Sequence, residues 1–198
     1  MLSRRHLLCG LGALAAGATL PLSAQAAITG LQGPLPLSTE MSYGDFVPAP
    51  AAWFNLLRQH PELDPQSTPM ASVNLTPARA ALLMKVNKEV NREVSYRADA
   101  GTDVWNVGGR EGDCEDIAIR KLAVLTQVHG LSRGALTLAA CRLDYSRGHA
   151  VLLVHSDSGV YVMDSLTSRV APWRSLPYSW TAREEPGAPF RLWRSLKV

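Results

Sequence analysis

The stretch that decides the fold is GGREGDCEDIAIRKLAVL, Gly108 to Leu125. From Asp113 to Val128 the apolar residues recur at intervals of three and four, as on one face of an α-helix. The residues that carry this period are Ala118, Leu122 and Leu125, with Ile119 and Val128 beside them. His129-Gly130 then ends the pattern, as glycine commonly does after a helix. The sequence therefore predicts an amphipathic helix that packs one face on a core.

A cysteine stands in the first turn of this predicted helix, within a cluster of acids. Cys114 lies between Asp113 and Glu115, and Asp116 follows. Nearby negative charge raises the pKa of a thiol, which opposes its use as a nucleophile. A nucleophilic Cys114 therefore needs a compensating cation, and we expect the flanking carboxylates to face away from its sulfur.

Two more helices are predicted upstream, after an arm over residues 27–48 that is rich in Gly, Pro and Ser. The segment from Ala49 to Gln59 predicts a short helix with Trp53, Leu56 and Leu57 on one face. Thr76 is a good N-cap and Pro77 suits a first helical position, so a longer helix is predicted from there to Val94. Its apolar face consists of Leu83, Val86, Val90 and Val94.

Downstream of residue 130 the pattern changes to that of β-strands. Strands are predicted at Ala135–Leu143, His149–His155 and Val160–Leu166, with Asp157-Ser158-Gly159 as the turn of a hairpin between the last two. Val170–Ser175 and Phe190–Leu196 are candidates for two more. Helices followed by a meander of strands predict an α+β fold, with N-terminal helices packed on an antiparallel sheet.

The first 26 residues have the features of a signal peptide. Basic Arg4 and Arg5 precede an acid-free run of Leu, Ala and Gly, which ends in the cleavage pattern Ala24-Gln25-Ala26. Paired arginines after Ser3 are typical of twin-arginine export, while Leu7 in place of the usual phenylalanine leaves ordinary secretion open. We expect residues 27–198 to form a single exported domain.

Composition narrows the class of function. Apolar residues make up 46% of the 198 residues and charged residues 19%, which is usual for a globular protein. The net charge is +3, and loss of Arg4 and Arg5 leaves 18 basic residues against 17 acidic ones. The cationic residues do not cluster, so the sequence gives no support for nucleic-acid binding, and no segment after the leader is apolar enough to span a bilayer.

Three residues can form a catalytic constellation on this scheme. His149 opens one predicted strand and Asp164 lies near the end of the next, so the hairpin makes them cross-strand neighbours. If the helix packs its N-terminus against that edge, Cys114 is the nucleophile, His149 the base and Asp164 the orienting carboxylate. The helix N-terminus and an imidazolium supply the positive charge that the thiolate needs. The backbone N–H of Cys114 is a candidate oxyanion donor.

Other interpretations of these residues stay open from the sequence. Removal of the leader, with its Cys9, leaves Cys114 and Cys141, which in an oxidising compartment are able to form one disulfide. His149 is also compatible with a structural role at a strand edge, and Asp164 with capping a turn. On that view the protein is a disulfide-bonded periplasmic binding module without enzymatic activity.

Three segments resemble a known family, the bacterial transglutaminase-like cysteine proteinases, which include LapG-like periplasmic proteases. They are GDCEDIAIRK (Gly112–Lys121), GHAVLLV (Gly148–Val154) and YVMDSL (Tyr161–Leu166), and the resemblance covers residues 87–173. It implies a papain-like or transglutaminase-like core with Cys114, His149 and Asp164 as the triad, and a periplasmic location. The chain departs from the family in a shorter segment before Cys114 and in Ser165, where Asn is common.

The resemblance also implies dependence on calcium. By position, Asp113 and Glu115 become ligands, with Asp116 as a further one. Calcium takes six to eight oxygen ligands, so Asp99 and Asp103 in the preceding loop are the natural additional donors. The alternative is that Asp113, Glu115 and Asp116 are simply favourable residues for the first turn of a helix.

The sequence thus favours an exported cysteine peptidase. The resemblance implies a protein substrate, namely the N-terminal region of a large surface adhesin, and an inner-membrane cyclic-di-GMP receptor that sequesters the protease. A transglutaminase-like acyl transferase or amidase with the same triad is the alternative enzyme, because both reactions pass through the same acyl-enzyme.

Overall fold

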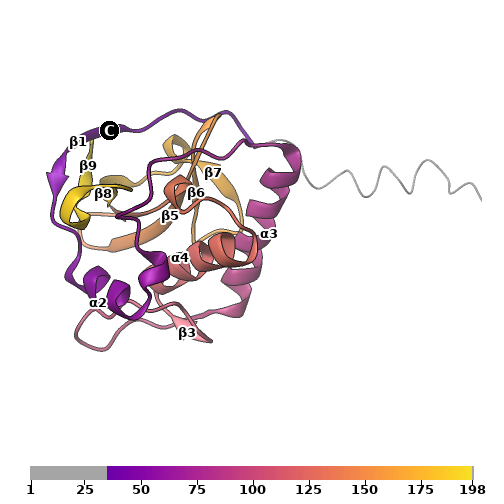
Figure 1. Ribbon diagram of the computed structural model, residues 1–198. Helices are drawn as coiled ribbons and strands as arrows, with labels where there is room; N and C mark the ends of the chain where they lie inside the picture. The colour runs from indigo at the N-terminus through magenta and orange to yellow at the C-terminus, as the bar shows by residue number, and fades with distance from the viewer. Residues whose placement is uncertain (1–34, 198) are drawn as a thin grey trace, which may run out of the picture. The chain divides into compact units, whose positions relative to one another are not determined.

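A computed structural model describes residues 35–197, and the predicted signal peptide at 1–26 lies outside these residues. The described part is an α+β domain in which helices pack on one face of a seven-stranded antiparallel sheet, as the sequence predicted. The three α-helices are α2 (Ala51–Gln59), α3 (Pro77–Glu93) and α4 (Cys114–Ala123). Figure 1 shows α3 and α4 side by side against the sheet.

The sheet has the strand order β1-β9-β8-β4-β5-β6-β7. Its strands, in chain order, are β1 (Ser42–Val47), β4 (Leu136–Arg142), β5 (Gly148–Ser156), β6 (Gly159–Met163), β7 (Val170–Pro172), β8 (Ser179–Glu184) and β9 (Trp193–Lys197). A separate parallel pair joins β2 (Ser95–Tyr96) to β3 (Glu111–Gly112), directly before α4. The meander from β4 to β7 follows the prediction, whereas β8 and β9 return to the other side of β4.

The predicted starts of α3 and α4 are confirmed, whereas α2 begins at Ala51 and not at Ala49, and α4 ends earlier than predicted. Thr76 caps α3 by accepting the backbone N–H of Arg79 at 3.3 Å, with Pro77 at the first helical position. The predicted helix over residues 113–128 instead ends as an α-helix at Ala123, and a π-helical turn follows over Val124–Val128. Val128, assigned to the apolar face from its spacing, is 72% exposed because the wider turn moves it off the helical period.

Several strand predictions need correction. The third predicted strand ends at Met163, so Asp164 and Leu166 lie in the loop beyond it. The predicted Val170–Ser175 strand ends at Pro172 and becomes a 3-10 turn, and the last strand begins only at Trp193. Part of the predicted arm forms β1, and the strand β8 was not predicted at all.

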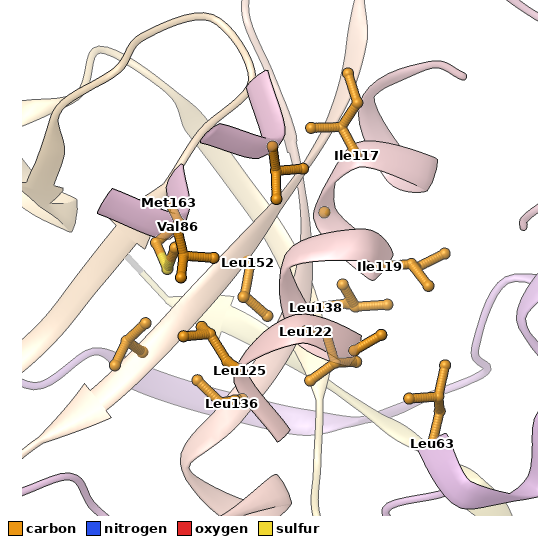
Figure 2. Close-up of a cluster of buried hydrophobic side chains, with 14 of the residues drawn as sticks. Leu63, Val86, Ile117, Ile119, Leu122, Leu125, Leu136, Leu138, Leu152 and Met163 are labelled. Atoms are coloured by element: carbon orange, nitrogen blue, oxygen red, sulfur yellow. The ribbon is translucent and has the colours of Figure 1, made fainter. Parts of the chain in front are cut away.

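The main core lies between the helices and the sheet. Leu122 of α4 and Leu125 of the following π-helical turn are fully buried against the sheet face that carries Leu136 and Leu152. Figure 2 shows these side chains together with Leu63, Val86, Leu138 and Met163. A second apolar cluster covers the opposite face and includes Met41, Cys141, Trp173 and Trp180. Within residues 35–197, no helix is both long enough and apolar enough to cross a bilayer.

Candidate active site

Two glycines determine how the chain enters α4. A side chain at Gly112 would place its Cβ only 2.6 Å from the Cβ of Asp116, and one at Gly108 would lie 2.9 Å from the carbonyl oxygen of Asp116. Glycine at both positions therefore lets the preceding loop lie directly on the first helical turn. The backbone N–H of Asn106 donates to Asp116 Oδ1 at 2.7 Å and anchors the same loop. Cys114 is the first residue of the helix that this loop leads into.

The sulfur of Cys114 lies at an open stretch of the sheet. Within the described chain, β6 pairs with β5 only from Leu152 onward, so the first residues of β5 have no β6 partner. The backbone N–H of Ala150 in this stretch donates a hydrogen bond to Cys114 Sγ. The structure thus brings Cys114 next to the residue that follows His149, as expected for a helix packed on this edge.

The structure also brings His149 and Asp164 together. His149 Nε2 lies 2.8 Å from Asp164 Oδ1, and both side chains are almost fully buried, with exposures of 4% and 1%. An ionised carboxylate only accepts hydrogen bonds, so His149 donates through Nε2. Its Nδ1 is then left to face other groups. Cys141, the partner of His149 in the β4–β5 register, lies on the neighbouring strand.

Asp164 is held by donors on both carboxylate oxygens. The backbone N–H of Leu166 donates to Oδ1 at 2.9 Å, and the hydroxyl of Tyr178 donates to Oδ2 at 2.5 Å. Asn91 of α3 donates to the carbonyl oxygen of Asp164 at 2.8 Å. Burial raises the pKa of the Asp164 carboxyl, but the hydrogen bonds from His149, Leu166 and Tyr178 bring it below its usual value. The carboxylate is therefore ionised at neutral pH.

The electrostatic state of Cys114 differs from the expectation in one respect. Its thiol donates to Glu115 Oε2 at 2.9 Å, so this carboxylate faces the sulfur and not away from it. Burial raises the pKa of the Cys114 thiol, and the charge of Glu115 raises it further. The reason is local, because Cys114 and Glu115 are neighbours in the first turn of α4.

The remaining acids gather on the outer side of this turn. The Glu115 carboxylate accepts a hydrogen bond from the Cys114 thiol. Burial and the neighbouring Asp103 raise the pKa of Glu115 to about 8. Burial, together with the charges of Asp113 and Asp99, raises the pKa of Asp116 to about 6. For Asp113, burial and then the charges of Asp99 and Asp103 raise the pKa. Charges within this group of five predicted ligands therefore raise the pKa values of Asp113, Glu115 and Asp116. Among the described residues, no three His, Cys, Asp or Glu side chains converge in a metal-binding arrangement.

The sequence matches the model of a protein family described as bacterial transglutaminase-like cysteine proteinase over residues 43–198. The chain belongs to this family. The family's description, which names a cysteine proteinase with a likeness to transglutaminases, agrees with the resemblance seen in the sequence. No curated protein of known function matches the chain.

Three structures of LapG from Legionella pneumophila are similar to this proteinase. An EGTA-treated form is 29% identical with a TM-score of 0.45, over 52% of this chain and 61% of that one. A calcium-bound form is 27% identical with a TM-score of 0.49, over 61% and 70%. A third is 28% identical with a TM-score of 0.47, over 56% and 65%. The proteinase thus spans about three fifths of the first of these chains.

The acid cluster of the proteinase suits calcium in its chemistry. All five side chains offer hard carboxylate oxygens, which is the donor type that calcium prefers. Asp113 Oδ1 is buried without a hydrogen-bond partner among the described residues. Asp99 and Asp116 line one cavity of about 360 Å³. Buried carboxylates with raised pKa values and an unsatisfied oxygen are the arrangement that a bound cation would stabilise.

The two cysteines of the described chain, Cys114 and Cys141, are both free. The disulfide on which the non-enzymatic interpretation depends is therefore not formed in this structure. Cys141 is 2% exposed, and burial raises its pKa to about 12, so it is an inert thiol packed in the core.

Sequence reasoning missed two residues near the pair of His149 and Asp164. Tyr178 comes from the segment before β8, and no local pattern indicates its contact with Asp164. Lys121 is fully buried on α4, seven residues after Cys114 and therefore two turns along the same side of the helix. The seven-residue spacing between Cys114 and Lys121 is visible in the sequence and could have indicated that Lys121 lies on the same side of the helix.

Proposed function

We propose that this protein is an exported cysteine peptidase that uses Cys114 as nucleophile, His149 as general base and Asp164 as the residue that orients the imidazole. The observation that carries the proposal is the meeting of three elements at one sheet edge. The sulfur at the start of α4 accepts the N–H of Ala150, and the adjacent His149 is hydrogen-bonded to Asp164 at 2.8 Å.

The proposed reaction follows from the hydrogen-bonding state of His149. Because Nε2 donates to Asp164, Nδ1 is the nitrogen that takes the thiol proton of Cys114. The thiolate attacks the peptide carbonyl carbon, and the N–H of Cys114 at the helix N-terminus is placed to donate to the oxyanion. The imidazolium then protonates the leaving amine, and an acyl-enzyme remains. Water, deprotonated by His149, hydrolyses the thioester and frees the sulfur.

Glu115 must release the thiol before this reaction can begin. We propose that Asp113, Glu115 and Asp116, with Asp99 and Asp103 from the preceding loop, hold a calcium ion. The ion supplies positive charge that offsets the mutual repulsion of these carboxylates. If Glu115 were held as a ligand, its carboxylate would no longer accept from the Cys114 thiol, and His149 would be left as the proton acceptor.

We extend the proposal to location and partners on the family resemblance alone. The leader directs the protein to the periplasm, and the substrate is a protein there or at the cell surface, such as a large adhesin of the biofilm. An inner-membrane cyclic-di-GMP receptor is the proposed sequestering partner.

The test compares a strain carrying Cys114→Ala with its parent and with a Cys141→Ala strain, by sequencing the new N-termini in periplasmic and surface proteins. We expect the cleavage product to disappear with Cys114→Ala, because the nucleophile is lost and activity falls about 1,000-fold or more. Cys141→Ala should leave cleavage within a few-fold. Cleavage that persists in Cys114→Ala would exclude the proposal.

The same experiment separates the alternative reaction. A transglutaminase-like acyl transferase would give isopeptide cross-links that depend on Cys114, without new N-termini. No feature of the described residues favours an amine over water as the acceptor.

A further inference from the structure

We propose that Tyr178 is a positioning residue that locks the Asp164–His149 pair in its working orientation. The inference rests on the proposed catalytic function of this pair. Tyr178 lies in the short segment between the 3-10 turn at Trp173–Ser175 and β8, outside every motif identified in the sequence.

The first contact fixes the carboxylate. Asp164 Oδ1 already accepts two hydrogen bonds, from His149 Nε2 and from the backbone N–H of Leu166. The Tyr178 hydroxyl donates to the other oxygen, Oδ2, at 2.5 Å. With a donor on each side, the carboxylate cannot rotate to exchange its two oxygens without breaking a hydrogen bond in a buried place. Oδ1 therefore stays directed at the imidazole.

The second contact fixes the imidazole. The ring of Tyr178 meets His149 edge-on, with centroids 5.8 Å apart and planes at 78°. The other side of Tyr178 packs on Trp180, with centroids 5.8 Å apart, and Trp180 is buried. His149 thus rests against an aromatic pair anchored in the second core, and this pair excludes water from one side of the His149–Asp164 hydrogen bond.

The sheet register explains why Tyr178 reaches this place. Cys141 of β4 pairs with Trp180 of β8 on one side and with His149 of β5 on the other, so these three residues form one row across the sheet. Tyr178 stands two residues before Trp180, where the chain has left β8. Its side chain can therefore extend past this row to His149. The pairing of β8 with β4 thus contributes to the site, although β8 comes late in the chain.

The consequence concerns the proton acceptor of Cys114. An imidazole held by Asp164 at Nε2 presents Nδ1 in one fixed direction. Without the Tyr178 hydroxyl, the buried Oδ2 loses its only described donor, and the orientation of Asp164 is less well defined. We therefore expect Nδ1 of His149 to be held less well in the position from which it takes the Cys114 thiol proton, so that alkylation of Cys114 slows.

The test uses iodoacetamide as a small electrophile, so it does not require the natural substrate. The mature full-length protein, supplied with calcium chloride, is compared as wild type, Tyr178→Phe and Tyr161→Phe. Tyr161 is the matched control, because its hydroxyl also donates one hydrogen bond, to the carbonyl of Pro36 at 2.9 Å, on the opposite face of the sheet. Mass spectrometry follows labelling of Cys114 and Cys141 separately.

We expect Tyr178→Phe to lower the Cys114 labelling rate about tenfold at pH 6 and to lower it less at about pH 9.5, where hydroxide competes with His149 as the base that removes the thiol proton. Tyr161→Phe should stay within twofold at both values. Buried Cys141 should remain unlabelled in all three proteins, which shows that the fold is intact. Labelling of Cys114 in Tyr178→Phe within twofold of wild type at pH 6 overturns the inference.

Failure of the proposed function gives a different result. If wild-type Cys114 labels at pH 6 as slowly as an unperturbed thiol, no thiolate–imidazolium pair exists and the catalytic proposal falls together with this one. If Cys141 becomes labelled in Tyr178→Phe, Tyr178 acts as a general packing residue and its positioning role is rejected.

Discussion

At the scale of single residues, the most unusual group is a buried lysine. Lys121 is 0% exposed, and its Nζ has no hydrogen-bond partner among the residues described. Burial lowers its pKa to about 7, while the charge of Asp164 raises it. A charged group in such a place opposes folding, because burial removes the water that stabilises the ammonium. Lys121 thus weakens the fold at a position directed toward the proposed catalytic carboxylate.

We predict that Lys121→Met stabilises the protein at low pH. The pKa of Lys121 is lower in the folded state than its usual value near 10.4, so the folded state gains stability as the pH rises from about 7 to about 10. Methionine removes this penalty, which is on the order of a few kcal/mol below pH 7. The difference in Tm between the variant and wild type should be largest below pH 7 and shrink above it. A variant that melts lower than wild type at every pH would show that Lys121 has a stabilising partner.

Single residues also show what the sequence could reveal about the site. The places of Cys114, His149 and Asp164 could be predicted because each stands at or next to the end of an element whose period is clear. The contact between Cys114 and Glu115 was predicted wrongly, because charge alone gives no direction for a side chain. Tyr178 was invisible, since its contact with Asp164 depends on how β8 returns to the sheet.

At the scale of elements, helix α4 connects the core to the site. Its N-terminus carries Cys114, and its buried face, including Ile119 and Leu122, packs on β5 and the adjoining strands. The start and the buried face of α4 were predictable from spacing and from the acids of the first turn. Its end was not, because a π-turn depends on packing and leaves no simple period. Strands β8 and β1 were not predicted, because the Pro-rich or polar segment beside each of them obscures its alternation of apolar and polar residues.

We predict that Leu122→Ala lowers the free energy of unfolding by about 2–5 kcal/mol, because it leaves a cavity between α4 and the sheet. Val128→Ala is the matched control. It lies on the same chain segment but is 72% exposed, so its effect should stay within about 0.5 kcal/mol. Urea denaturation measures both. Equal effects of the two substitutions would contradict the assigned end of α4.

At the scale of the whole molecule, the acid cluster connects the loop before α4 to this helix and, through the helix, to the sheet. The loop from Asp99 to Asn106 is joined to α4 through Asp116 and Glu115, and α4 in turn is joined to the sheet. Raised pKa values mean that the folded state binds protons that the unfolded state releases. Without a cation, this cluster therefore makes the protein less stable as the pH rises from about 4 toward 8.

We predict that calcium raises the Tm and that the increase is larger at pH 8 than at pH 5, because protons compete for the same carboxylates. Excess EGTA should remove the increase. Differential scanning calorimetry of wild type and of Asp113→Asn measures it, and the variant should show a smaller increase. No change in Tm with calcium at pH 8 would remove the basis for the proposed metal site.

The open stretch of β5 has a consequence for the cellular fate of the protein. Unpaired backbone groups at a strand edge are where another chain can add a strand and begin to aggregate. Here the edge beside β6 is occupied by the start of α4, with the N–H of Ala150 directed at the cysteine sulfur. The helix start that carries the proposed nucleophile thus also covers this edge of β5, so that a strand of another chain cannot pair with it. Variants that loosen the start of α4 should accumulate as insoluble material before they appear as soluble, inactive protein.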